Sequence, residues 1–301
     1  MDMYQKREMR KNKKMDENEK SLPSTSINWF PGHMAKAKRE IKEKIDLIDM
    51  VFEVIDARIP KSSKNNDIED IIKSKPRVLI MTKSDLCDKS ITLEWKKYYE
   101  DKGYKVVLLD LLHDNINQVF SIVNELMESI NSKRISKGLK ARKVRSLVLG
   151  IPNVGKSTLI NRLVGKKVVN VGNKPGITKN LEWIRINDKL ELLDTPGILW
   201  PKFDEEEVAY NLASMTAIKE EILDIEDISI YIINKMFKLY PDNIKSRYGV
   251  NYDEDIVNIL DGIGRKIGAI KNNEVDYDRV YTMVLRDLRD GYLGKITFDR
   301  F

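Results

Sequence analysis

The sequence predicts an α/β fold, in which a mostly parallel sheet carries helices on both faces, followed by a small all-helical domain. The first part is predicted because short apolar runs of strand length alternate with segments of helical periodicity. The second part is predicted because only helical spacing of apolar residues remains beyond residue 204. We therefore expect a disordered polar extension over 1–26, an α/β domain over 27–203 and a helical domain over 204–301.

The composition favours a globular protein in a reducing compartment. Apolar residues make up 42% of the 301 residues, enough for a sizeable core. The single cysteine, Cys87, can form no internal disulfide and leaves no thiol-based zinc site. No apolar run is long enough to span a bilayer, so we expect a cytoplasmic protein without membrane contact. The net charge of +6 is a mild indication of an anionic partner.

The expected elements follow one another along the chain. Strands are expected over Met50–Ile55, 77–81, Val106–Leu109, Ser146–Leu149, Leu181–Ile186 and Lys189–Leu193. Helices are expected over 33–46, Lys64–Lys73, Ile91–Glu100, Asn115–Asn131 and from Ser157 onward, and then over Glu205–Glu221, Asp224–Leu239, Asp253–Ile259 and Tyr277–Arg289.

The segment Leu147–Leu159, LVLGIPNVGKSTL, has the spacing G-x-x-x-x-G-K-S between a strand and a helix start. In that context the pattern is a phosphate-binding P-loop, whose glycines let backbone N–H groups surround phosphate oxygens. Lys156 is expected to reach the β- and γ-phosphates, and the Ser157 hydroxyl to bind Mg²⁺. The sequence therefore predicts a nucleoside triphosphate site lined by Asn153, Val154, Gly155, Lys156, Ser157 and Thr158.

The strand expected over 77–81 ends in Thr82, Lys83, Ser84 and Asp85. Ligands of α/β proteins bind at the carboxyl ends of parallel strands. The Asp85 carboxylate can accept hydrogen bonds from N1–H and the 2-amino group of guanine, and adenine offers neither. A site built on such bonds rejects an analogue that lacks them by roughly 10⁴-fold. The Lys83 stem can lie over the base, so these four residues predict guanine recognition.

Two further segments fit the γ-phosphate and its metal ion. Thr178 follows a glycine-containing loop that begins at Gly172, and its hydroxyl can bind Mg²⁺. The run Asp194-Thr-Pro-Gly197 ends the second strand of a hairpin. Asp194 fits the acid that orders the Mg²⁺ shell, and the Gly197 N–H fits a γ-phosphate sensor. The expected Mg²⁺ residues are therefore Ser157, Thr178 and Asp194.

The order of these motifs is unusual. In a conventional small GTPase the P-loop comes first and the guanine motif late, whereas here the guanine motif stands at 82–85 and the P-loop at 150–157. We therefore predict a circularly permuted P-loop GTPase domain. Its Asp194–Gly197 loop leads into the separate C-terminal region instead of another strand of the sheet.

Two basic stretches are candidates for nucleic-acid contact. Lys133–Arg145 holds seven basic residues and no acid, and it is either a solvated linker or a phosphate-backbone contact. The C-terminal region begins with an acidic stretch over Asp204–Asp227 and ends with basic residues. These are Arg265, Lys266, Lys271, Arg279, Arg286, Arg289, Lys295 and Arg300.

Several segments together resemble one known family. The segments WFPGHMAKA, VIDARIP, GIPNVGKSTLINRL, PGIT, DTPGILWP and LRDLRDGYLGKITFD are similar to the YlqF/YawG family of circularly permuted GTPases, over about Asn28–Phe301. The resemblance implies hydrolysis of GTP to GDP and phosphate, in support of late assembly of the large ribosomal subunit. It also implies contact with large-subunit rRNA through a C-terminal RNA-binding module of the antiterminator type.

The resemblance also implies roles for single residues. Ile198 stands where other GTPases carry a catalytic glutamine, and the histidine of the family's W-F-P-G-H segment maps onto His33, the expected catalytic residue. The asparagine that places a potassium ion in the family matches Asn153, so K⁺ is expected beside Mg²⁺.

Two positions depart from the family pattern. Thr82 replaces an asparagine, and its shorter hydroxyl weakens the expected contact with guanine N7. The loop after the next strand reads Leu109-Asp110-Leu111-Leu112, without the usual Ser-Ala. Leu109 and Asp110 are therefore expected to serve the base through backbone N–H groups.

The leading hypothesis is a GTPase that binds the large ribosomal subunit precursor as a ribosome-associated monomer stimulated by ribosomal particles. One alternative is a GTPase switch that acts on another RNA, such as tRNA. A P-loop kinase or ATPase is a second alternative, against which Asp85 argues. A non-hydrolysing RNA-binding scaffold is a third, against which the complete Mg²⁺ set argues.

Overall fold

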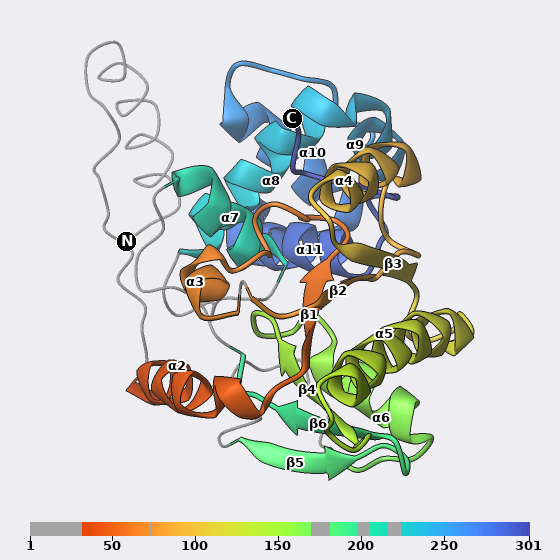
Figure 1. Cartoon of the computed structure of the whole chain (residues 1–301). Coiled ribbons are helices and arrows are strands. Elements are labelled where there is room, and N and C mark those ends of the chain that lie inside the picture. The colour runs from red at the N-terminus through yellow and green to blue at the C-terminus, as the bar shows by residue number, and fades with distance from the viewer. Residues whose placement is uncertain (1–31, 73, 170–180, 198–204, 216–223) are drawn as a thin grey trace.

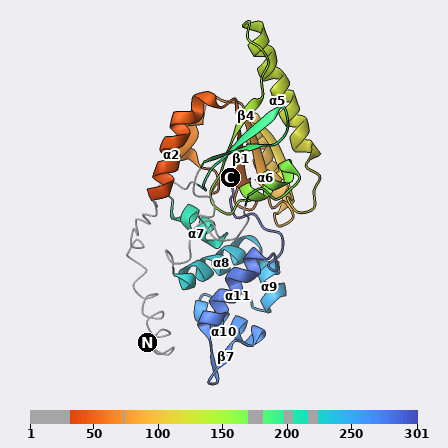
Figure 2. The ribbon, with the colours of Figure 1, turned by 90° about the horizontal axis from the view of Figure 1, so that it is seen from below.

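The computed structural model describes residues 32–72, 74–169, 181–197, 205–215 and 224–301, and Figure 1 shows their arrangement. The expected polar extension over 1–26 lies outside these residues. An α/β part occupies one end of the described structure and a helical part the other, as the view in Figure 2 makes clear. No helix of the described residues is long and apolar enough to cross a membrane.

The sheet of the α/β part has the strand order β3-β2-β1-β4-β6-β5. Its strands are β1 Met50–Asp56, β2 Arg77–Thr82, β3 Lys105–Leu109, β4 Val144–Leu149, β5 Glu182–Arg185 and β6 Leu190–Asp194. All neighbours are parallel except β5 and β6, which form the expected hairpin. From β1 the chain proceeds outward to β2 and β3, and then returns to β4 on the other side of β1. The boundary between β1 and β4 is therefore the topological switch point, where ligands of open α/β sheets bind.

Helices cover both faces of this sheet, as predicted. The helices of this part are α2 Gly32–Lys44, α3 Glu69–Ile72, α4 Lys89–Asp101, α5 Asn117–Ser136 and α6 Lys156–Val164, with short 3₁₀ turns at Ile45–Leu47 and Asn66–Ile68. On one face α2, α3 and α4 bury apolar side chains against the sheet, and on the other α5 and α6 do so. All seven residues of β1 are buried because this strand is covered on both faces.

The helical part consists of α7 Glu206–Ser214, α8 Ile225–Leu239, α9 Pro241–Tyr248, α10 Ile256–Ile267 and α11 Tyr277–Arg289. A two-stranded ribbon, β7 Ile270–Lys271 with β8 Glu274–Val275, separates α10 from α11. Buried side chains of α8, α10 and α11 form the core of this part. The core is continuous with that on the α5–α6 face of the sheet.

Several expected boundaries were wrong. The helix expected over Lys64–Lys73 is a 3₁₀ turn and the short α3, because Lys64 is buried and lies 3.4 Å from the Glu53 carboxylate. The helix expected over Asp253–Ile259 begins at Ile256, where the Asp255 side chain caps it by accepting from the Val257 N–H. It runs on to Ile267 past two glycines. Helix α9 and the ribbon were not expected.

Two other segments match only in part. The helix expected over Asn115–Asn131 continues to Ser136, so the first part of the basic stretch Lys133–Arg145 is helical. The helix expected over Glu205–Glu221 is α7 Glu206–Ser214, and residues 216–223 lie outside the described residues.

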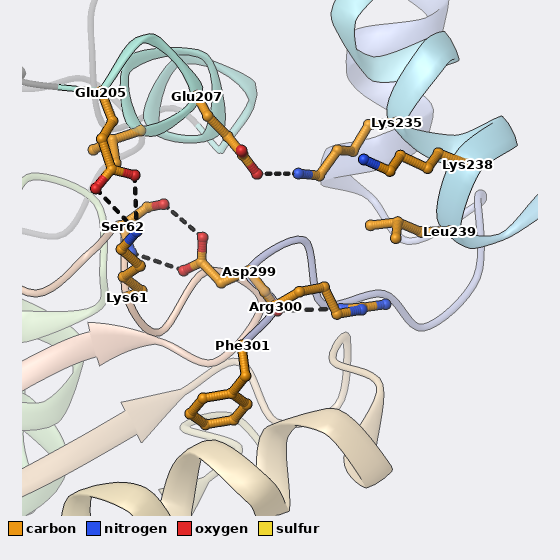
Figure 3. Close-up of a pocket in the computed structure, with 11 residues that line it drawn as sticks. Lys61, Ser62, Glu205, Glu207, Lys235, Lys238, Leu239, Asp299, Arg300 and Phe301 are labelled. Carbon is orange, nitrogen blue, oxygen red and sulfur yellow. Dashed lines mark hydrogen bonds and ion pairs between the residues drawn. The ribbon is translucent and has the colours of Figure 1, made fainter.

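The last residues of the chain return to the α/β part. The backbone N–H groups of Ile296 and Phe298 donate to the carbonyls of Leu86 and Arg58, at 3.0 and 2.8 Å. The Asp299 carboxylate accepts from the N–H and hydroxyl of Ser62, at 2.7 and 2.6 Å (Figure 3). The two parts are therefore joined by hydrogen bonds as well as by a shared core.

Candidate nucleotide site

The P-loop leaves β4 at the switch point, directly beside β1. Gly150 has φ +152°, and a Cβ there would lie 2.4 Å from the Val54 carbonyl oxygen of β1, so only glycine fits. Asn153 and Gly155 also have positive φ, +61° and +99°. These angles turn the loop around its own centre before α6 begins at Lys156. The predicted phosphate loop therefore has strand, loop and helix in the expected places.

Lys156 bends back over the loop. Its Nζ donates to the carbonyls of Gly150 and Ile151, at 3.0 and 2.8 Å, and the side chain is buried. Burial lowers the pKa of Lys156 to about 8, although the nearby Asp194 opposes this shift. Burial likewise raises the pKa of Asp194 to about 6, although Lys156 opposes it. The charges of these two groups are therefore incompletely compensated in the protein alone.

Asp194 and Ser157 fit a magnesium site. The Oδ1 atom of Asp194 is buried and has no hydrogen-bond partner within the described residues. Such an orphaned carboxylate oxygen suits a hard cation or a water bound to it. The described residues hold no cluster of three or more His, Cys, Asp or Glu side chains that could bind a metal alone. A Mg²⁺ ion here would therefore need the Ser157 hydroxyl and the phosphate oxygens of a bound nucleotide. Thr178, the third expected Mg²⁺ residue, lies outside the described residues.

The predicted γ-phosphate sensor lies against the P-loop. Thr195 donates its hydroxyl to the Val148 carbonyl of β4, at 2.7 Å. A Cβ on Gly197 would lie 2.6 Å from the Pro152 nitrogen, so the backbones of the two loops touch. This close approach places Gly197 beside the phosphate loop, and its role as a γ-phosphate sensor stays a prediction. Ile198, the next residue, lies outside the described residues.

The guanine motif ends β2, and its first residue is bonded to the P-loop. The Thr82 hydroxyl lies 2.6 Å from the Val154 carbonyl and 3.0 Å from the Ile55 carbonyl. The side chain is fully buried, so its single hydroxyl proton serves these carbonyls. Thr82 thus joins two motifs that are 72 residues apart, and the expected contact with guanine N7 stays a prediction. Ser84 is buried, and the Asp85 carboxylate has no hydrogen bond within the described part of the chain.

Asp56 is a residue that the sequence reasoning missed. It ends β1, and its Oδ2 atom lies 2.8 Å from the Nζ of Lys83. Arg58 also binds this carboxylate, with Nε at 3.0 Å from Oδ1 and a terminal nitrogen at 2.9 Å from Oδ2. Burial alone raises the pKa of Asp56, but Arg58 and Lys83 together hold it well below its usual range. The signal for Asp56 in the sequence was an acidic residue directly after the apolar run of the expected strand Met50–Ile55.

The loop after β3 is held by the P-loop helix. Arg162 of α6 donates to the carbonyls of Leu111 and Asp114, at 2.6 and 2.5 Å. A Cβ on Gly155 would lie 2.8 Å from the Leu111 side chain. Asp110 turns the loop by accepting from the N–H of Leu112, at 2.7 Å. The expected base-reading segment at Leu109 and Asp110 is therefore next to the P-loop, and its contact with the base stays a prediction.

His33 lies in the first turn of α2, but its side chain is outside the described structure, as are all atoms of residues 1–31. Its expected catalytic role is therefore untested. The second histidine, His113, lies 2.6 Å from the Asp110 carboxylate and is largely exposed.

A family model and individual relatives match the chain. The model of the 50S ribosome-binding GTPase family matches residues 145–269. That match begins at β4, so the guanine motif at 82–85 precedes it, as a permuted order requires. Ribosome biogenesis GTPase A of Priestia megaterium is 45% identical over 278 residues, which cover 91% of this chain and 96% of the relative. Mitochondrial ribosome-associated GTPase 1 of Bos taurus is 30% identical over 295 residues, covering 90% and 88%.

Solved structures share the fold. The GNP-bound YlqF of T. maritima has a TM-score of 0.62 and 24% identity, covering 88% of this chain and 98% of that chain. The GDP-bound form of T. maritima YlqF gives the same TM-score at 23% identity, covering 87% and 99%. The permuted α/β part and the helical C-terminal part are thus an arrangement already seen in a solved structure.

Proposed function

The chain belongs to the ribosome biogenesis GTPase A family, and from that premise we propose that it binds the large ribosomal subunit precursor and hydrolyses GTP to support a late step of its assembly. Members with this name cover nearly the full length of the chain, at up to 45% identity among those compared. Binding of guanine nucleotide and hydrolysis of GTP follow from the family. The large subunit, the late step and stimulation by ribosomal particles are the parts that we propose.

One observation carries the enzymatic part of the proposal. The guanine motif and the P-loop are joined by the hydrogen bond from Thr82 to the carbonyl of Val154, 72 positions further along the chain. A nucleotide at the switch point would therefore meet both motifs at once. If the chain were a kinase or an ATPase, Asp85 would lie beside an adenine, which cannot donate the two hydrogen bonds that guanine offers to this carboxylate.

Different residues of the P-loop would contact different parts of the triphosphate. Lys156 can leave the carbonyls of its own loop for the β- and γ-phosphates, and the backbone of Gly155 and Thr158 can donate to phosphate oxygens. Ser157 and Asp194 would hold Mg²⁺, with Thr178 as the third residue. When bound, this ion offsets the charge that develops on the phosphates during hydrolysis. We place K⁺ at Asn153, as the family resemblance implies.

His33 is the proposed catalytic residue. The family position occupied by glutamine in other GTPases is Ile198 here, an apolar side chain that cannot orient water. We expect intrinsic hydrolysis to be slow, because groups that complete a GTPase site are worth about 10³–10⁵-fold in rate. His33→Ala should leave GTP affinity and particle binding nearly intact and abolish most particle-stimulated hydrolysis. If the folded His33→Ala variant keeps full stimulated turnover, His33 is not catalytic and the ribosomal partner supplies the catalytic group.

The structure divides the basic stretch Lys133–Arg145 into two sets. Arg142 pairs with Asp49, and Lys143 and Arg145 pair with Glu191, so these three serve the fold. The other four lie in the last turn of α5 or just after it, and α5 projects from the α/β part on the side away from the helical part (Figure 2). No ion pair links these four, Lys133, Arg134, Lys137 and Lys140, to a described acid. We propose this α5 tip as a contact for rRNA phosphates.

The C-terminal basic residues divide in the same way. Arg286 pairs with Asp290, and Arg289 donates to the carbonyls of Ala213 and Ser214 at 2.9 and 3.0 Å. Arg300 is bound to Tyr240 at 2.9 Å. Arg265 lies 3.8 Å from the Asp261 carboxylate. The exposed remainder, Lys266, Lys271, Arg279 and Lys295, has no ion pair within the described residues and forms the proposed RNA surface of the helical part.

Co-sedimentation with ribosomal particles tests the partner. In a non-hydrolysable GTP analogue the monomeric protein should sediment with large-subunit precursors and not with tRNA. Replacing the four cations of the α5 tip with glutamine should flatten the salt dependence of that binding, since each lost phosphate contact lowers the slope by about 0.7–0.9. The matched control replaces Lys166 and Lys167, which are also exposed. Equal slopes in the two variants would remove the α5 tip from the proposed surface, and sedimentation with tRNA alone would favour the alternative switch.

A further inference from the structure

Asp56 and Lys83 form an ion pair at the edge of the predicted guanine site. Asp56 is 1% exposed, whereas the Lys83 side chain is 26% exposed. Lys83 is therefore the member of this cluster that a ligand in the crevice can reach, and Asp56 is the buried group behind it. Burial lowers the pKa of Lys83, although the Asp56 carboxylate opposes this shift and favours the ammonium form.

Charge balance alone does not account for the contact with Lys83. Arg58 already neutralises Asp56 through two side-chain hydrogen bonds, and the Arg58 N–H donates a third, at 3.0 Å to Oδ1. The bond from Lys83 is the fourth, and it fixes the end of a flexible side chain. Lys83 also has φ +58°, an unusual backbone angle for a residue with a Cβ. The lysine is thus held at its backbone and at its Nζ.

We propose that Asp56 is a positioning residue for guanine recognition, which holds the Lys83 stem in the orientation that packs on the base. This inference rests on the proposed guanine nucleotide site. A lysine side chain carries about 2 kcal/mol of rotamer entropy, which is lost when it is ordered on a ligand. Asp56 imposes that order before the nucleotide binds, so binding need not do so.

The loop that carries Asp56 is itself held at three points. The Asp56 N–H donates to the Ser63 hydroxyl at 3.0 Å, and the Arg58 carbonyl accepts from Phe298 at 2.8 Å. Ser62 is bound to the buried Asp299 carboxylate (Figure 3). Asn211 of α7 reaches both partners, at 3.0 Å from the Ser62 hydroxyl and from Asp299. Asp56 therefore stands on a rigid support, as a positioning role requires.

Asp56→Asn tests this role, because asparagine keeps the size of the side chain and removes the charge that holds Lys83. The dissociation constants for fluorescent GTP and GDP analogues should both rise, by about tenfold, because the base contact is common to the two nucleotides. The rate of hydrolysis at saturating GTP should stay near that of the wild type, because the proposed role of Asp56 lies in the base contact and not in the chemical step. An unchanged affinity in a folded variant overturns the inference.

A double-mutant cycle separates positioning from general stability. In a Lys83→Ala background Asp56→Asn should weaken binding no further, because its effect passes through the lysine. Additive losses would mean that Asp56 acts by another route and would overturn the inference. If Asp56→Asn does not fold, the same cycle with Asp56→Glu, which displaces the carboxylate by one methylene, carries the test.

The matched control is Asp287→Asn. Asp287 is also 1% exposed and is also bound by an arginine, Arg247 at 2.7 Å, but it lies in α11 of the helical part. This variant should lose thermal stability without a change in nucleotide affinity. Failure of the wild-type protein to bind GTP would contradict the proposed function, whereas equal affinities of wild type and Asp56→Asn contradict only the present inference.

Discussion

The two halves of the nucleotide crevice differ in how their charges are satisfied. In the guanine half, the Asp56 carboxylate accepts four hydrogen bonds from Arg58 and Lys83, and Thr82 is bonded to the neighbouring loop. In the phosphate half, Lys156 rests on carbonyls of its own loop, and one oxygen of Asp194 has no partner among the described residues. The buried carboxylate of the guanine half is thus fully paired without ligand, whereas the buried carboxylate of the phosphate half is not.

This difference indicates where binding energy is gained. Buried charges without full compensation destabilise the protein alone, and their pKa values move toward neutrality, as those of Lys156 and Asp194 do. A triphosphate with Mg²⁺ would supply the missing partners. In the proposed site the guanine half would instead offer a rigid surface to the base, with Asp56 already paired before the nucleotide binds.

Lys156→Ala should produce the largest effect and tests the phosphate half directly. The loss of charge-assisted hydrogen bonds to two phosphates, at about 1.5–3 kcal/mol each, should weaken GTP binding by at least about 100-fold. The thermal stability of the nucleotide-free protein should not fall, because a lysine with a lowered pKa is removed. Titration with a fluorescent GTP analogue and a thermal melt measure the two quantities. A large loss of stability without loss of affinity would show that Lys156 stabilises the fold and does not bind phosphate, which contradicts the description of the phosphate half as incomplete.

Asp85→Asn should have a smaller effect on affinity and changes specificity. The variant should bind GTP about 10- to 100-fold more weakly, since one charged acceptor is lost from the base. It should tolerate xanthosine triphosphate better, because the 2-oxo group pairs with an amide donor. Competition between the two nucleotides measures this change. Wild-type GTP affinity in the variant would remove Asp85 from the guanine site.

Asp194→Asn should stabilise the nucleotide-free protein at pH 7. The pKa of Asp194 is raised from 3.8 to about 6, so the folded state binds more protons than the unfolded state between these values. Stability from this group is therefore lost as pH rises through that window. The shift already includes the opposing attraction to Lys156, and it corresponds to a gain of up to about 3 kcal/mol.

Denaturant unfolding in metal-free buffer at pH 4 and pH 7 measures this gain. The wild type should lose stability relative to Asp194→Asn as the pH rises, and added Mg²⁺ with GTP should favour the wild type. A pH dependence that is the same in both proteins would show that Asp194 is compensated, in contrast to the incomplete phosphate half described above.

Phe301→Ala should have the smallest effect and tests the support of the guanine half. The Phe301 ring stacks on Trp95 of α4, with centroids 4.1 Å apart, but is largely exposed. Its loss should lower stability by about 1 kcal/mol, or about 2–4 °C in the melting temperature. Leu112→Ala is the control, since Leu112 is 72% exposed. Equal melting temperatures of the wild type, Phe301→Ala and Leu112→Ala would show that the Phe301 ring does not stabilise the support of the guanine half.

Local sequence was sufficient for the parts of the site that depend on backbone shape. The P-loop glycines Gly150 and Gly155 have the positive φ angles that glycine favours, and Gly197 of the DTPG run lies where a Cβ would meet Pro152. Short apolar runs predicted the six strands, and the order of the motifs predicted the permutation. These features are short in range, and the residues that determine them are adjacent in the chain.

Only the tertiary structure identified the contacts between distant segments. In the sequence, Asp56 is only the last residue of an expected strand. In the structure β1 lies beside β2, and this pairing brings the Asp56 carboxylate to Lys83. The return of residues 296–299 to the loop after β1 has no local signature, since its hydrogen bonds join groups up to 240 residues apart, as Phe298 and Arg58 are. Periodicity likewise could not show which cations of Lys133–Arg145 pair with acids. By itself the sequence determined the turns of the P-loop and the order of the motifs, because motif spacing encodes backbone shape. Which groups of the site are satisfied and which await a ligand was decided only by packing, because burial and partners depend on the whole fold.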